Sequence, residues 1–67
     1  MNDRERIGKR IAELRMAKGI SQAQLSELTG IAPGNIARIE LGKYSTGIDI
    51  LSKIAKELGY KVDFVKE

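Results

Sequence analysis

The sequence predicts a compact all-α fold, a bundle of four helices, followed by one short β-strand at the C-terminal end. The helices are predicted because glycines at positions 19, 30, 42 and 59 each follow a stretch with apolar residues at helical spacing. The strand is predicted because apolar and charged residues alternate from Tyr60 to Phe64. A chain of 67 residues makes one domain, which we divide into a helical unit, residues 1–59, and a C-terminal element, residues 60–67.

The first two predicted helices begin at recognisable capping residues. Asn2 or Asp3 can cap a helix over residues 3–18. Ser21 and Gln24 form the Ser-x-x-Gln capping box that starts the second helix. Apolar residues at helical spacing should form the buried faces of these two helices: Ile7, Ile11, Leu14, Leu25 and Leu28.

The third and fourth predicted helices are also marked at their starts. Pro33 lies in the first turn of the third helix, residues 33–41, where its missing N–H costs no hydrogen bond. Thr46, followed by Asp49 three residues later, predicts the start of the fourth helix, which ends at Gly59. Their buried faces should consist of Ile36, Ile39, Leu51, Ile54, Ala55 and Leu58.

The C-terminal element carries apolar residues at strand spacing: Tyr60, Val62 and Phe64. A single strand cannot satisfy its own backbone groups, and the chain contains no second candidate strand. The segment therefore either lies extended against the helices or pairs with the same segment of another molecule across a two-fold axis. We favour the second interpretation, which makes these three residues a dimerisation strand.

The composition argues against an enzyme. Without cysteine or histidine the chain has no disulfide, no zinc or haem site of the usual kind, and no imidazole for a nucleophilic triad. Its carboxylates lie on predicted polar helix faces, with nothing to bring them together. We therefore expect no catalytic site, metal or cofactor. The apolar runs are too short to span a membrane and no signal peptide is visible, so we expect a cytoplasmic protein.

The formal net charge of +3 arises at the beginning of the chain. Residues 1–19 hold six basic and three acidic side chains, whereas residues 20–47 and 48–67 are each balanced. Such an excess indicates a solvated helix face more readily than a patch that faces phosphates. Charge alone therefore does not identify a partner.

The second and third predicted helices are joined by a short turn. The small Ser26 lies where the two helices would approach each other, and Gly30 lies at the bend. Apolar anchors lie on both sides of the turn: Leu25, Leu28, Ile31, Ile36 and Ile39. This is the helix-turn-helix arrangement, although any helical hairpin would require similar residues.

Five stretches extend this pattern over residues 7–59: IAELR at 11–15, GISQAQL at 19–25, GI at 30–31, IARIELGK at 36–43 and LSKIAKELG at 51–59. In these residues the chain resembles the helix-turn-helix DNA-binding domains of the phage repressor and Cro (XRE) type, with their lambda-repressor-like fold. The resemblance implies a sequence-specific transcriptional regulator, a repressor, that binds double-stranded DNA as a homodimer. Its recognition helix, residues 33–41, would lie in the major groove, with half-sites roughly 34–36 Å apart.

The resemblance also assigns roles to residues before and after the turn. The counterpart of Gln22 contacts a DNA phosphate and braces the recognition helix. The backbone N–H groups of Ser21 and Gln22 would direct the positive end of the helix dipole at that phosphate. Arg15 and Glu40 match a semi-buried ion pair whose role is structural.

The recognition helix departs from the family pattern at its start, because Pro33 and Gly34 offer no side-chain donor or acceptor. They act either as capping residues or, for Pro33, as a contact to a thymine methyl. Only Asn35 and Arg38 can make directional base contacts; Asn suits adenine and Arg suits guanine. The loop that follows matches one that contacts phosphates, with a solvated loop as the alternative: Lys43, Tyr44 and Ser45.

A second class of function is an antitoxin-like interaction module. Domains that resemble this one also serve as antitoxins, which neutralise a partner protein, a toxin, and repress their own operon. The C-terminal strand would then belong to a protein interface. The sequence favours the DNA-binding regulator over this module, and favours either of them over an enzyme.

Overall fold

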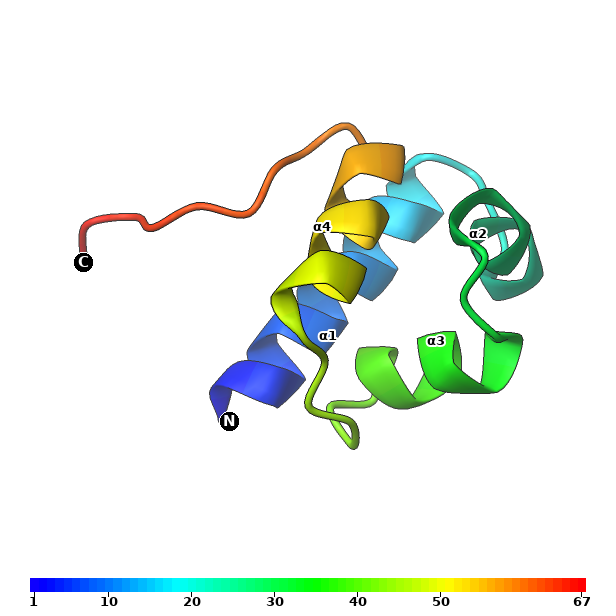
Figure 1. Cartoon of the computed structure of the whole chain (residues 1–67). Coiled ribbons are helices and arrows are strands. Elements are labelled where there is room, and N and C mark those ends of the chain that lie inside the picture. Colours follow the sequence, from blue (N-terminus) through cyan, green and yellow to red (C-terminus); the bar gives the residue numbers. More distant parts are fainter.

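The computed structural model describes all 67 residues and consists of four α-helices with no strand (Figure 1). The helices are α1 (Asp3–Ala17), α2 (Gln22–Thr29), α3 (Pro33–Glu40) and α4 (Ile48–Glu57). The predicted all-α bundle of four helices is therefore confirmed, and the predicted C-terminal strand is wrong.

Two reciprocal capping boxes start α1 and α2. At α1 the cap is Asn2, whose side chain accepts from the Glu5 N–H while the Glu5 carboxylate accepts from the Asn2 N–H. At α2 the Ser21 hydroxyl accepts from the Gln24 N–H at 3.0 Å, and the Gln24 side chain accepts from the Ser21 N–H at 2.7 Å. Both helix starts are thus fixed by local hydrogen bonds, as the sequence predicts for Ser21 and Gln24.

The start of α4 differs from the prediction. Its N-cap is Gly47, which makes no side-chain cap hydrogen bond, so the helix begins one residue after the position that a Thr46 cap requires. The Thr46 hydroxyl is instead buried and has no hydrogen-bond partner. Because Thr46 precedes the cap, its side chain does not reach the free N–H groups of the first turn.

The core is a single cluster to which all four helices and the turn before α3 contribute. It consists of Ile11, Leu25, Ile31, Ile36, Ile39, Ile54 and Leu58. Leu28, predicted to be buried, is 53% exposed. On α2 the residue that is buried with Leu25 is Thr29, one turn later. Its hydroxyl donates to the Leu25 carbonyl at 2.7 Å and accepts from the Ile31 N–H at 3.3 Å, so it is fully hydrogen-bonded.

Gly8 allows α1 to approach the end of α3 closely. A Cβ atom built on Gly8 would lie 2.2 Å from the Ile39 carbonyl oxygen and 2.7 Å from that of Glu40. Only glycine fits between these backbones, because a methyl group at that distance would overlap the carbonyl oxygen. The position of α3 against α1 therefore depends on a residue without a side chain, which the sequence pattern does not single out.

Residues 60–67 leave the end of α4 as an extended tail that projects from the helices (Figure 1). The Tyr60 N–H still bonds to the Ala55 carbonyl at 2.8 Å, and no later residue makes a backbone–backbone hydrogen bond. Phe64 is fully exposed. Apolar and charged residues alternate in this segment as they do in a strand. A strand also needs a neighbouring strand to pair its backbone N–H and C=O groups, and one chain provides none.

Candidate nucleic-acid interface

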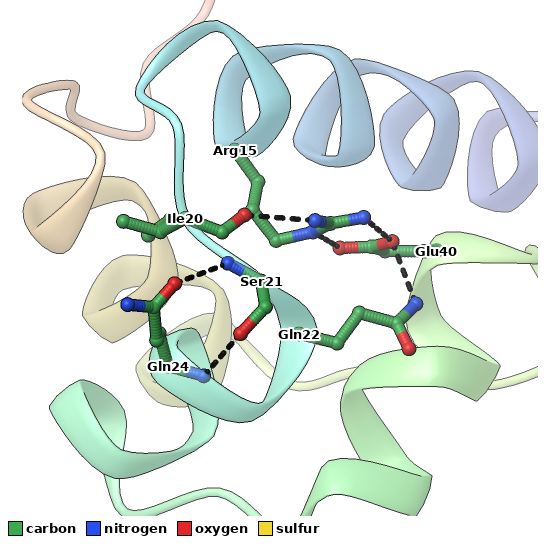
Figure 2. Close-up of polar contacts among 6 residues, drawn as sticks. All are labelled: Arg15, Ile20, Ser21, Gln22, Gln24 and Glu40. Atoms are coloured by element: carbon green, nitrogen blue, oxygen red, sulfur yellow. Dashed lines mark hydrogen bonds and ion pairs between the residues drawn. The ribbon is translucent and has the colours of Figure 1, made fainter.

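Arg15 and Glu40 form a bidentate ion pair between α1 and α3. Arg15 Nε lies 2.7 Å from Glu40 Oε2, and Arg15 Nη2 lies 3.0 Å from Oε1 (Figure 2). The side chains are only 12% and 6% exposed. The hydrogen bond with Glu40 raises the pKa of the Arg15 guanidinium, against an opposing effect of burial, so the guanidinium stays charged at neutral pH.

The same two residues hold the segment before α2. Arg15 Nη1 donates to the Ile20 carbonyl at 2.9 Å, and Gln22 Nε2 donates to Glu40 Oε1 at 2.9 Å (Figure 2). The carboxylate of Glu40, on α3, thus accepts hydrogen bonds from Arg15 on α1 and from Gln22 on α2. We call Arg15, Gln22 and Glu40 the polar hub; it ties α3 to the rest of the molecule through charge-assisted hydrogen bonds.

The N-terminus of α2 retains free backbone donors. The Ser21 N–H is bonded to Gln24, and the first backbone bond of the helix runs from the Leu25 N–H to the Ser21 carbonyl at 3.0 Å. The N–H groups that stay free for an anion are therefore those of Gln22 and Ala23 rather than that of Ser21. The capping box gives a sequence signal for this shift by one residue, because it engages the cap N–H.

The outward face of α3 holds Pro33, Gly34 and Arg38, while Asn35 is half-buried beside them. Ile36 and Ile39 point into the core. Arg38 Nη1 donates to Asn35 Oδ1 at 2.7 Å. Because helical side chains lean toward the N-terminus, the guanidinium reaches back over the first turn, and a Cβ atom built on Gly34 would lie 3.9 Å from it.

The loop after α3 continues along the same edge of the molecule (Figure 1). Its side chains Lys43, Tyr44 and Ser45 are all exposed. The Lys43 N–H bonds to the Arg38 carbonyl at 2.9 Å, which fixes the loop to the end of α3. The structure thus brings the predicted phosphate-contacting loop next to the predicted base-reading residues.

The basic residues of α1 are partly neutralised within their own helix. Arg6 lies 3.3 Å from Asp3, and Arg10 lies 3.8 Å from Glu13.

No group of three or more potential ligand side chains is arranged to hold a metal ion. No helix combines the length and apolar character that crossing a membrane requires.

An exposed short helix that follows a tight turn and is braced by the helix before it is the arrangement of helix-turn-helix DNA-binding domains. The Helix-turn-helix family model matches residues 11–65. The chain therefore belongs to the helix-turn-helix family of DNA-binding transcriptional regulators, XRE type.

Two regulators show the similarity at the sequence level. The HTH-type transcriptional regulator PuuR of Escherichia coli (strain K12) is 40% identical over 52 residues, which cover 78% of this chain and 28% of PuuR. The SPbeta prophage-derived uncharacterized HTH-type transcriptional regulator YonR of Bacillus subtilis (strain 168) is 31% identical over 59 residues, 88% of this chain and 55% of YonR. The chain thus spans less than two thirds of each of these relatives.

A solved structure shows the similarity in three dimensions. The crystal structure of the restriction-modification controller protein C.AhdI from Aeromonas hydrophila matches with a TM-score of 0.84 at 32% sequence identity. The match covers 88% of this chain and 89% of that one.

Proposed function

We propose that this chain is a sequence-specific repressor that binds double-stranded DNA with α3 in the major groove. The observation that carries the proposal is the pair formed by the half-buried Asn35 and the exposed Arg38, on a helix that the polar hub bonds to α1 and α2. Base contacts from such a helix specify the sequence, whereas contacts to phosphates position the protein. The free N–H groups of Gln22 and Ala23 and the side chain of Lys43 supply the phosphate contacts.

The proposal is tested by titrating labelled, mixed genomic DNA fragments with the full chain at several salt concentrations. We expect the affinity to fall as salt rises, because cationic side chains release counterions from DNA. Lys43→Ala should weaken binding to all fragments alike and lower the salt slope by about one unit. The control is Lys56→Ala, which should leave both quantities unchanged. Lys56 belongs to the last turn of α4, and Figure 1 shows that end of α4 well apart from α3. Salt-independent binding, or none, would reject the proposal.

We propose further that the chain acts as a homodimer and that residues 60–67 form its dimerisation element, without a β-strand. The support for this is unburied apolar surface. Tyr60, Val62, Phe64 and Val65 are all exposed. Between the tail, α1 and α4 lies a groove of about 390 Å³, lined mainly by apolar side chains that include Ile7, Leu14, Leu51, Leu58 and Val62. A second copy would bury both the tail and the groove.

Sedimentation equilibrium of the full chain and of two variants tests the dimer. The full chain should have the mass of a dimer, whereas Phe64→Ser and a chain that ends at Gly59 should have the mass of a monomer and bind DNA more weakly. Both variants should keep their helix content, because every core residue lies between Ile11 and Leu58. A full chain that is monomeric, or a truncated chain that is still dimeric, would contradict the proposed role of the tail.

A further inference from the structure

The two residues predicted to read bases separately are bonded to each other. Arg38 Nη1 donates to Asn35 Oδ1 at 2.7 Å, across one turn of α3. This is a charge-assisted hydrogen bond, which is stronger than a bond between two neutral groups. It ties the acceptor atom of Asn35 to the guanidinium and leaves the Asn35 amide N–H donors without a partner in the chain.

The surroundings of Arg38 leave its other donors free. The ion pairs of the chain involve Arg6, Arg10 and Arg15, so no carboxylate competes for the Arg38 guanidinium. Gly34 places no side chain beside it. A Cβ atom built on Gly34 would be in ordinary van der Waals contact with the guanidinium, so Arg38 lies over a first turn that carries no side chain at that position.

We propose that Asn35 and Arg38 read DNA as one unit that presents mainly hydrogen-bond donors, and that this unit selects guanine and a neighbouring acceptor rather than adenine. The inference rests on the proposed function and specifies the bases that its site takes. Guanine presents two acceptors, O6 and N7, in the major groove, whereas adenine presents one acceptor and one donor. Adenine recognition by Asn needs the side-chain oxygen as an acceptor, and in this chain one of the two lone pairs of that oxygen already accepts from the Arg38 guanidinium.

Asn35 has two roles in this unit. It is a positioning residue for Arg38, because the bond fixes the orientation of a long side chain before DNA arrives and so reduces the entropy lost on binding. Its amide N–H group is also free to donate to an acceptor on the adjacent base pair, such as thymine O4 or a second guanine. This proposal differs from the expectation that Asn35, as an asparagine, suits adenine.

The inference is tested by selecting binding sites from a randomised duplex library with the full chain, then measuring affinity for the selected duplex and its single-base variants. We expect guanine at one fixed position of each half-site. Replacing it by adenine should lower wild-type affinity about tenfold or more. Arg38→Ala should lose this discrimination, and Asn35→Ala should lose most of it while retaining affinity for mixed DNA.

Two further variants separate positioning from a merely structural effect. Asn35→Asp keeps an acceptor for Arg38 and should keep the guanine preference that Asn35→Ala loses, although its charge lowers affinity for all DNA. The double variant Asn35→Ala/Arg38→Ala should discriminate no worse than Arg38→Ala alone, because the two residues act together. These substitutions lie outside the hydrophobic core, and thermal unfolding tests that each variant is folded.

A change of a single DNA atom gives a readout that does not depend on protein stability. Replacing the selected guanine by 7-deazaguanine removes the N7 acceptor and should lower wild-type affinity several-fold, with no effect on Arg38→Ala. An adenine preference that depends on Asn35 but not on Arg38, or losses that simply add in the double variant, would overturn the inference and leave the proposed function intact. A folded chain that binds no duplex would overturn the proposed function itself.

Discussion

At the scale of single residues, Arg15 is the side chain on which the position of α3 depends most. It donates to Glu40 on α3 through two nitrogens and to the Ile20 carbonyl through a third. The Glu40 side chain is only 6% exposed, so its charge would lose most of its stabilisation if its partner were removed. Helix α3 is therefore held by the same bonds that satisfy a nearly buried charge.

Arg15→Ala should lower the free energy of unfolding by on the order of 3–5 kcal/mol, because it leaves Glu40 buried with only Gln22 as a partner. Urea unfolding followed by circular dichroism measures this change. Arg6→Ala is the matched control, since it removes an exposed ion pair with Asp3 and should cost about 0–1 kcal/mol. Equal unfolding midpoints for the two variants would contradict the structural role of Arg15.

The pH dependence of this contribution follows from the direction of the Arg15 pKa shift. Because the folded pKa is raised, the stabilisation is fully present below the unfolded pKa and is lost only as pH rises through the folded pKa. Both values lie far above neutrality for an arginine. The difference between the wild type and Arg15→Ala should therefore stay constant across the neutral pH range.

At the scale of elements, the sequence predicts most where a side chain acts on its own helix. The capping box at Ser21 and the inward positions of Ile36 and Ile39 follow from local spacing alone. The start of α4 and the exposure of Leu28 do not, because they depend on how a helix is rotated against its neighbours. The bond between Asn35 and Arg38 has a sequence signal, the spacing of three residues on one helix, but that spacing does not show which donor and acceptor atoms are engaged.

The N-cap of α4 is a position where a substitution should raise the stability of the fold. Gly47 has the extended backbone of an N-cap, with φ −74° and ψ 167°, and a Cβ atom built there would meet nothing within 4 Å. Gly47→Ser should stabilise the fold by about 0.5–1 kcal/mol, because it adds a cap hydrogen bond and restricts the unfolded chain. Thermal unfolding measures the gain. Gly47→Ala, which has no hydroxyl, is the control, and an equal gain from it would show that capping is not the cause.

At the scale of the whole molecule, the basic excess and the candidate DNA contacts lie in different parts of the chain. The basic excess lies on α1, where Arg6 and Arg10 pair with acidic neighbours on the same helix. The proposed interface holds two cations, Arg38 and Lys43, in a segment whose net charge is zero. Its binding therefore depends on the positions of a few groups rather than on a strong field.

The prediction of the helical unit is confirmed and the prediction of a C-terminal strand is wrong, and both outcomes have the same physical reason. The helical unit satisfies its own hydrogen bonds, so its architecture follows from one chain, whereas a strand at residues 60–67 would require a partner that the chain lacks. The helix-turn-helix face is built from residues close together in the sequence, and the resemblance to the family already indicates it. A partner protein of the antitoxin type stays a prediction of that resemblance alone.

The central claim is that DNA meets the face formed by α3, the start of α2 and the loop after α3. Titrating the isotope-labelled full chain with a duplex, while following backbone amide chemical shifts by nuclear magnetic resonance, tests this claim most directly. We predict the largest changes at Gln22, Ala23, Asn35, Arg38 and Lys43, with little change along the outer face of α1. Changes concentrated on α1 and the tail, with α3 unaffected, would contradict it.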